Sequence, residues 1–152
     1  MSQKIGFIGQ GWIGRHYADE FERRGYEVVR YSLDPLYSHN REAIADCPIV
    51  FIAVPTPTTE SGYDDSIVRE TLALLAPHST AVIKSTLLPG TTKRLQTLFP
   101  NITILHSPEF LVEATAAFDA ANPLRNIIGV PEMSEPWLSR ADEVMSDRKS
   151  VV

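Results

Sequence analysis

Two hydrophobic patterns alternate along the chain: short apolar runs of strand length, and longer segments with helical periodicity. The apolar runs predict six strands, at residues 4–9, 27–31, 49–54, 80–83, 102–105 and 126–130. The intervening segments predict helices at 12–24, 65–76, 91–99, 112–121 and 135–145, and residues 41–45 allow one or two helical turns. The run from Ile49 to Val54 has no polar interruption, which is typical of a strand covered on both faces.

Strands separated by helix-length segments favour parallel pairing with right-handed crossovers. We therefore predict an α/β fold, a Rossmann-type doubly wound parallel sheet with six strands in the order 3-2-1-4-5-6. Ligands of such sheets bind at the carboxyl ends of the strands, near the point where the strand order reverses. The candidate site is therefore formed by the loops after Ile8, Val54, Lys84 and Leu105.

Composition narrows the class of protein. The chain has 152 residues, of which 43% are apolar and 22% charged, as expected of one globular domain; we place it at residues 1–146, with a frayed tail at 147–152. No apolar run approaches the ~20 residues of a membrane-spanning helix, and Met1 leads into a strand without a signal peptide. We therefore expect a cytoplasmic protein without a membrane partner. The net charge of −5 argues against nucleic acid as a partner.

The chain has few cysteine and histidine residues. The one cysteine, Cys47, excludes an internal disulfide and a site of several thiolates, in agreement with a reducing compartment. The four histidines are scattered without the spacing of metal ligands, so we predict no metal site.

The first strand–helix junction carries a glycine-rich motif. Gly9-Gln10-Gly11-Trp12-Ile13-Gly14 reads G-x-G-x-x-G, in which the first glycine permits a tight turn, the second lets the backbone approach a pyrophosphate, and the third lets the helix pack closely. The free N–H groups of the helix N-terminus attract the same anion. The motif predicts dinucleotide binding, with Trp12 over the pyrophosphate or covering the helix start. The alternative is that the glycines only make a tight turn.

The end of the second strand leaves the choice of cofactor open. A carboxylate there normally accepts hydrogen bonds from the adenosine ribose and repels a 2′-phosphate. Asp34 can do this from just beyond the strand, which favours NAD. Otherwise Ser32 occupies the position and the site tolerates NADP, with Arg30 available if its side chain points that way. Because Asp34 precedes Pro35, it is also a typical turn residue.

Four further segments resemble one family. They are Val54-Pro55-Thr56-Pro57, Lys84-Ser85-Thr86-Leu87-Leu88-Pro89-Gly90-Thr91-Thr92, Ser107-Pro108-Glu109-Phe110-Leu111-Val112-Glu113 and Asn122-Pro123-Leu124-Arg125. Together they are similar to the N-terminal domain of the UDP-glucose and GDP-mannose dehydrogenases, the nucleotide-sugar 6-dehydrogenases. The resemblance covers residues 4 to about 130, and its motifs occur in the family's order.

The resemblance implies roles for matching residues. Val54, Pro55, Thr56 and Thr86 would contact the dinucleotide. The Thr86 hydroxyl would lie beside the nicotinamide and the reacting sugar carbon, holding water or an oxygen that develops charge. Glu109 would take part in proton transfer, and Glu113 would lie near the nicotinamide. The backbone of Phe110 and Leu111 would contact the sugar nucleotide. The alternative is a turn hydroxyl at Thr86 and helix-starting carboxylates at Glu109 and Glu113.

The departures from the family concern turnover. Family members oxidise an alcohol to a carboxylate through a cysteine of a second domain, which this sequence lacks. Cys47 precedes the third strand, at the amino end of the sheet, and cannot replace it. Ser107 stands where the family has Asn, Ala114 where it has Gly, and the segment 32–48 is shorter than usual.

The resemblance therefore implies a domain that binds NAD, or NADP, and contributes to NAD-dependent oxidation of a nucleotide sugar. The completing partner would be a substrate-domain chain, and a homo-oligomer is also compatible with the sequence. The alternative is a stand-alone module that binds a dinucleotide or a sugar nucleotide without catalysis.

Overall fold

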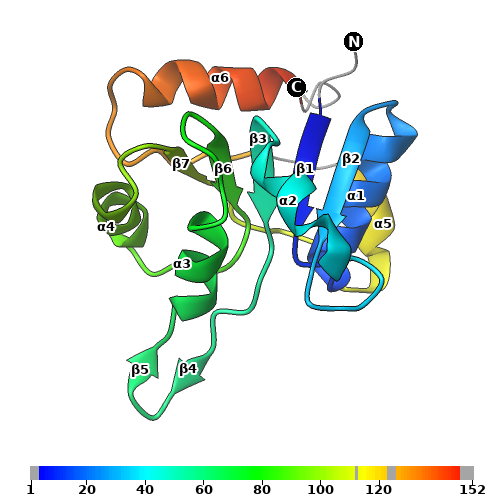
Figure 1. The fold of residues 1–152 in the computed structure, drawn as a ribbon, viewed down its shortest axis with the longest axis horizontal. Coiled ribbons are helices and arrows are strands. Elements are labelled where there is room, and N and C mark those ends of the chain that lie inside the picture. Colours follow the sequence, from blue (N-terminus) through cyan, green and yellow to red (C-terminus); the bar gives the residue numbers. More distant parts are fainter. Residues whose placement is uncertain (1–3, 112, 123–125, 148–152) are drawn as a thin grey trace.

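The computed structural model describes residues 4–111, 113–122 and 126–147. Its main sheet has five parallel strands: β1 (Lys4–Ile8), β2 (Glu27–Tyr31), β3 (Ile49–Ile52), β6 (Thr80–Ile83) and β7 (Thr103–His106) (Figure 1). The helices are α1 (Trp12–Arg23), α2 (Arg41–Ala45), α3 (Ser66–Leu72), α4 (Thr91–Leu98), α5 (Ala116–Ala121) and α6 (Trp137–Asp147), with short 3₁₀ turns at η1 (Ser38–Asn40) and η2 (Glu113–Thr115). A small hairpin of β4 (Thr58–Thr59) and β5 (Gly62–Tyr63) projects from the body.

The sheet confirms the predicted α/β class and corrects the predicted strand order. The neighbours run β2-β1-β3-β6-β7, so the five strands, counted along the chain, are ordered 2-1-3-4-5 rather than 3-2-1-4-5-6. The third strand pairs with β1, with Ile5 beside Ile49, and on its other side with β6. All four residues of β3 are buried, whereas β2 at the edge is mostly half-buried. A strand so fully covered belongs in the centre of the sheet.

The predicted sixth strand, at residues 126–130, does not form. Gly129 makes one antiparallel bridge to His106, with N···O distances of 2.6 and 2.9 Å, and no ladder extends from it within the described residues. Ile127 is half exposed, and Pro131, which has no N–H to donate, follows at once. The prediction was therefore wrong in this segment, and residues 123–125 of the predicted Asn-Pro-Leu-Arg motif lie outside the described residues.

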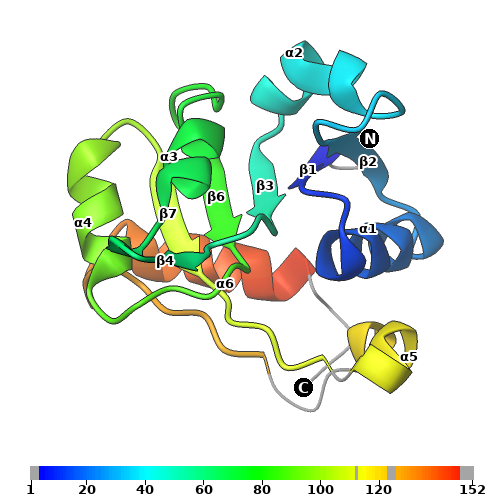
Figure 2. The same ribbon diagram turned by 90° about the horizontal axis from the view of Figure 1, so that it is seen from below.

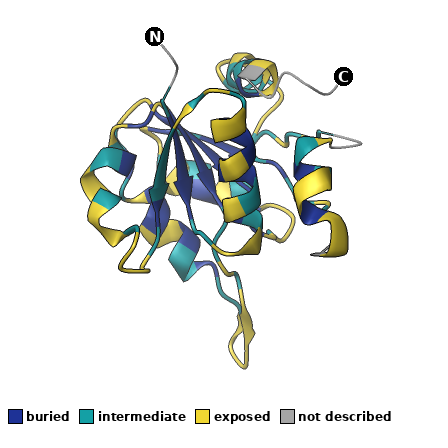
Figure 3. Cartoon of the chain, turned by 90° about the vertical axis from the view of Figure 1, so that its right-hand side faces the viewer, coloured by how far each residue is buried: buried dark blue, intermediate teal, exposed yellow. Residues whose placement is uncertain are grey.

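Two apolar layers cover the sheet. Ile8, Val50 and Ile52 pack with residues of α2, α3 and α4, whereas Phe7, Phe51 and Leu105 pack with residues of α1, α5 and α6. Figure 2 shows these two sets of helices on opposite faces of the sheet, and Figure 3 shows buried strands between helices whose outer faces are exposed. The alternation along each strand thus sends successive side chains into different cores.

Several helix boundaries differ from the prediction. The helix expected at 65–76 ends at Leu72, and the one expected at 112–121 begins at Ala116 after the η2 turn. Trp137 starts α6 and packs as predicted, with Nε1 donating to Oε1 of Gln96 at 3.0 Å. Helix α6 runs to Asp147, so the first residue of the expected tail is helical, and residues 148–152 lie outside the described part. None of the helices in the described residues has the length and the apolar character needed to cross a membrane.

Candidate functional site

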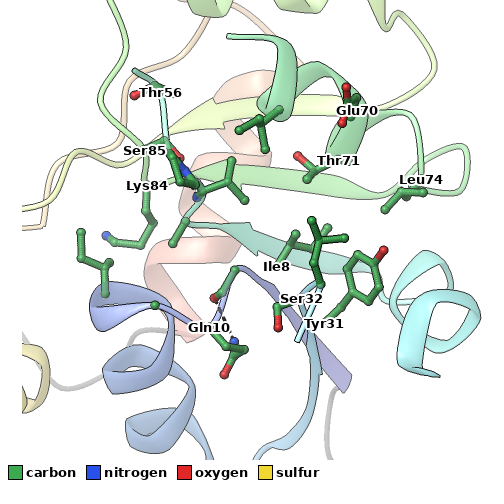
Figure 4. A pocket seen from close by; sticks show the side chains of 18 of the residues that line it. Ile8, Gln10, Tyr31, Ser32, Thr56, Glu70, Thr71, Leu74, Lys84 and Ser85 are labelled. Atoms are coloured by element: carbon green, nitrogen blue, oxygen red, sulfur yellow. Dashed lines mark hydrogen bonds between the residues drawn. The ribbon is translucent and has the colours of Figure 1, made fainter. Parts of the chain in front are cut away.

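The strand order reverses between β1 and β3. A cleft with a volume of about 960 Å³ opens at the carboxyl ends of these strands (Figure 4). The loops after β1, β3, β6 and β7 form it, together with the end of β2, the first turn of α1, the start of α2 and one side of α3. The lining residues are Ile8, Gly9, Gln10, Gly11, Ile13, Tyr31, Ser32, Leu33, Arg41, Ala53, Val54, Pro55, Thr56, Ile67, Glu70, Thr71, Ala73, Leu74, Lys84, Ser85, Thr86 and Glu109.

Two glycines of the loop are required by the packing of the protein itself. Gly9 has φ of +89°, and a Cβ there would collide with the carbonyl of Ala53. Its amide donates to the carbonyl of Tyr31 at 2.9 Å, so the turn is tied to β2. A Cβ on Gly14 would collide with the carbonyl oxygen of Gly9. These contacts fix the path from β1 into α1, as the motif predicts.

Gly11 is different, because the protein does not itself require a glycine there. Its φ of −70° is ordinary, and a Cβ added to it would meet nothing within 4 Å. Gly11 lines the cleft, and no side chain caps the helix that begins after it. The amides of Trp12, Ile13 and Gly14 donate to no group within the described part of the chain. Open amides beside an open surface fit the pyrophosphate of a dinucleotide.

The Trp12 side chain does not obstruct this turn. It is 45% exposed, lies edge-on to His16 with 4.7 Å between ring centroids, and is absent from the cleft lining. Gln10 does line the cleft; its Nε2 donates to the Gly9 carbonyl at 3.0 Å. Of the six predicted loop residues, Gly9, Gln10, Gly11 and Ile13 therefore line the cleft, whereas Trp12 and Gly14 do not.

At the end of β2 the cleft is lined by Ser32 and not by Asp34. The Asp34 carboxylate is exposed and accepts the Leu36 amide at 2.8 Å, so it closes a turn, which was the alternative interpretation. Its role as a ribose ligand remains a prediction without support from its position. Sequence reasoning that favoured NAD rested on this residue.

Arg30 does not reach the cleft either. Its guanidinium lies 2.8 Å from carboxylate oxygens of Asp19 and Glu22, both on α1. Burial acts to lower the pKa of Arg30, but the hydrogen bonds to Glu22 and Asp19 outweigh it and raise the pKa above its usual value. Arg30 thus fastens β2 to α1.

The loops after β3 and β6 are held together by hydroxyl groups. Ser85 Oγ accepts the Val54 amide at 3.0 Å and donates to the Val54 carbonyl at 2.7 Å. The Thr86 carbonyl accepts hydroxyl hydrogen bonds from Thr56 and from Tyr63 of the hairpin, each at 2.9 Å. Thr86 is exposed and lines the cleft together with Val54, Pro55 and Thr56, the residues that the motifs single out.

Glu109 is the most tightly held carboxylate of the cleft. Its Oε1 accepts the amides of Phe110 and Leu111 at 2.7 and 2.8 Å and the Tyr17 hydroxyl at 3.2 Å. Its Oε2 lies 3.3 Å from Nζ of Lys84. The amides of Phe110 and Leu111 are therefore occupied by this carboxylate, and Phe110 is 59% exposed. The side chain of Glu113, in η2, is outside what the structure describes.

Lys84 and several helix residues were missed from the sequence as site residues. Lys84 is 2% exposed at its side chain; its Nζ donates to the Ser107 carbonyl at 3.1 Å and lies 4.3 Å from the centroid of the Tyr17 ring. Its place as the last residue before the Ser-Thr loop was a signal that pointed to it. Arg41 and Glu70 come from helices, whose facing side the apolar pattern does not determine.

Cys47 lies away from the cleft, as expected. It is 1% exposed near the start of β3, and burial raises the pKa of its thiol to about 11. Among the described residues, no group of three or more His, Cys, Asp or Glu side chains is arranged to hold a metal ion.

A doubly wound sheet with an open helix N-terminus at its strand-order switch has the architecture of a nucleotide-binding domain. Residues 35–146 match the model of the UDP-glucose/GDP-mannose dehydrogenase family, NAD binding domain, and the chain belongs to that family. The match begins after the glycine loop, which is therefore assigned here from its geometry.

Curated relatives agree with this assignment. A UDP-glucose 6-dehydrogenase of Rhizobium meliloti is 32% identical over 188 aligned positions, covering 95% of this chain and 42% of the relative. A UDP-glucose 6-dehydrogenase of Pseudomonas aeruginosa is 33% identical over 106 positions, covering 60% of this chain and 23% of the relative. The chain thus spans less than half the length of these relatives.

Solved structures share the fold. A UDP-D-ManNAc dehydrogenase from Pyrococcus horikoshii superposes with a TM-score of 0.82 at 19% identity, covering 98% of this chain and 46% of that one. A UDP-glucose dehydrogenase from Pyrobaculum islandicum gives 0.78 at 22% identity, covering 97% and 44%.

Proposed function

We propose that this chain is the cofactor-binding part of a nucleotide-sugar dehydrogenase. Gly11 is the observation that carries the proposal, because it opens the cleft beside amides that no group of the described chain occupies. A pyrophosphate on those amides directs the adenosine toward Ser32 and the nicotinamide toward Thr86 and Glu109.

A bound nicotinamide dinucleotide supplies a hydride acceptor. Side chains of this chain then accept the proton that must leave the alcohol. Glu109 Oε2 faces Lys84 and forms no hydrogen bond within the described residues, and we assign to this atom the uptake of the proton, directly or through water. Tyr17 and the two amides hold the other oxygen in place. We assign to the Thr86 hydroxyl the donation of a hydrogen bond to an oxygen that gains negative charge.

The substrate class and the rest of the reaction are part of the proposal. The named relatives act on UDP-glucose, and the family resemblance implies a cysteine from a second domain. The one thiol of this chain is buried away from the cleft, so a completing domain must supply the nucleophile for full oxidation. We place this activity in the cytoplasm, in keeping with the lone buried thiol.

A calorimetric titration of the purified chain tests the cofactor step. We expect NAD or NADP to bind and to raise the melting temperature through preference for the native state. Gly11→Ala should weaken that binding at least about tenfold, because its Cβ would occupy the space of the pyrophosphate. If neither dinucleotide changes the melting temperature at millimolar concentration, the proposal is wrong.

A second candidate is a binding module without catalysis, favoured by the position of Cys47 and by the short segment between β2 and β3. Titration with UDP-glucose and GDP-mannose, and an assay for NADH or NADPH formation after adding the substrate domain of a relative, separate the two. Binding without reduction under those conditions favours the module.

A further inference from the structure

The corner of the cleft at the end of β2 departs from the pattern that selects NAD. In doubly wound sheets a carboxylate at this position binds the ribose 2′-hydroxyl, whereas a nearby Arg accommodates a 2′-phosphate. Here the residue after β2 is Ser32, which lines the cleft. Its Oγ accepts the Asp34 amide at 3.3 Å, so its own proton is left to donate. The Asp34 carboxylate is outside the lining and is bound by the Leu36 amide.

A cation lines the same corner. Arg41 is the first residue of α2, and the preceding residue, Asn40, donates Nδ2 to the Arg30 carbonyl at 2.9 Å. This hydrogen bond ties the start of α2 to β2 just before Ser32. The Arg41 side chain lines the cleft and forms no ion pair or hydrogen bond with any other described residue. In contrast to Arg30, its guanidinium donors are therefore not taken up by another described residue and can bind a ligand of the cleft.

The acidic residue that also lines this end of the cleft comes from the other wall. Figure 4 shows Glu70 on α3, across the cleft from Ser32 and Tyr31. Ser32 and Arg41 line the same cleft, and the hydrogen bond from Asn40 to the Arg30 carbonyl holds the start of α2 against β2. A phosphate suits this pair, since a guanidinium binds phosphate oxygens with two parallel N–H groups and a hydroxyl adds a third donor.

We infer that the cleft takes a dinucleotide with a 2′-phosphate, NADP, in preference to NAD, with Arg41 and Ser32 binding that phosphate. The inference rests on the proposed function, because it requires the pyrophosphate to lie at the start of α1. The family is described as NAD-binding, so this chain departs from its family at the ribose corner.

Two pairs of ligands test the inference by calorimetry on the full chain. The first pair is NADP against NAD, and the second is adenosine 2′,5′-bisphosphate against AMP, which isolates the ribose corner from the nicotinamide. We expect the 2′-phosphorylated member of each pair to bind at least about tenfold more tightly, with an advantage that shrinks as salt is added.

Three variants assign the preference to residues. Arg41→Ala should weaken NADP binding by about tenfold and change NAD binding by less than about twofold. Ser32→Asp should reverse the preference, because a carboxylate accepts from the ribose and repels the phosphate. Lys93→Ala is the matched control, since it removes one positive charge from an exposed position of α4 outside the cleft and should change neither affinity. Melting temperatures confirm that each variant folds.

The outcomes separate the two proposals. If NAD binds as tightly as NADP, or if the preference survives Arg41→Ala, the inference is overturned while the dinucleotide site stands. If neither dinucleotide binds, both the site and the inference fail.

Discussion

The ammonium nitrogen of Lys84 lies 3.3 Å from Oε2 of Glu109, and the two side chains are only 2% and 11% exposed. Such a pair stabilises a fold little more than apolar residues of the same size would, because both charges lose their contact with water. Removing one partner leaves the other charge buried without compensation. The pair therefore constrains the carboxylate more than it stabilises the fold.

Replacing Lys84 alone should be costly. Lys84→Met leaves the Glu109 carboxylate in a buried position without its cation, and we expect the free energy of unfolding to fall by about 3–5 kcal/mol. Adding Glu109→Gln should restore a large part of this loss, because no uncompensated charge remains. Urea unfolding of the two single variants and the double variant measures the coupling, and additive losses would contradict it.

The glycines of the α1 turn should separate folding from binding. Gly14→Ala places a Cβ against the Gly9 carbonyl and should lower the free energy of unfolding by about 1–3 kcal/mol. Gly11→Ala meets no protein atom, so its cost should stay below about 1 kcal/mol, mainly that of a poorer helix cap. Thermal unfolding compares the two, and equal losses would refute the distinction.

His106 should make stability depend on pH. Burial lowers the pKa of His106, and the Lys84 charge lowers it further, against the opposing hydrogen bond with the Ser85 carbonyl. The unfolded chain therefore binds a proton at this imidazole more readily than the folded chain does. The contribution of neutral His106 to the free energy of unfolding is complete above the unfolded pKa of about 6.5 and is lost as pH falls through the folded pKa.

Measured unfolding free energies should therefore decline as pH falls below about 6.5, and His106→Gln should flatten this part of the profile. His39→Gln, on the exposed η1 turn, is the control. An unchanged slope in His106→Gln would show that another group titrates in this window.

Cys47 should be unreactive in the folded protein. With its thiol buried and its pKa raised to about 11, the thiolate that reacts with iodoacetamide is scarce. We expect labelling to be at least about tenfold slower in buffer than in urea. Cys47→Ala should leave dinucleotide affinity unchanged, and weaker binding by this variant would contradict its position outside the cleft.

Sequence alone predicted the fold class and most of the cleft, because its signals are local. Glycines at fixed spacing, and loops that follow apolar runs, placed Gly11, Val54 and Thr86 at one edge of the sheet. The predicted strand order was wrong because an apolar run predicts a strand but does not determine which strands pair with it. The fully apolar run at 49–52 nevertheless indicated a central strand, which the 3-2-1 order contradicts.

The unpredicted part of the site depends on how helices sit on the sheet. Arg41 and Glu70 line the cleft only because α2 and α3 pack where they do, and that packing depends on long-range contacts such as Ile44 and Val68 in the same core. The carboxylate expected at the ribose lies outside the cleft lining for a local reason: Asp34 accepts a backbone amide in its own turn.

The β4–β5 hairpin is joined to the cleft through Tyr63, whose hydroxyl shares the Thr86 carbonyl with Thr56. Its tip stands clear of the body of the molecule (Figures 1 and 3). Because the hairpin and the loop after β3 share this one carbonyl as acceptor, a displacement of the hairpin would act directly on the backbone of Thr86 at the edge of the cleft.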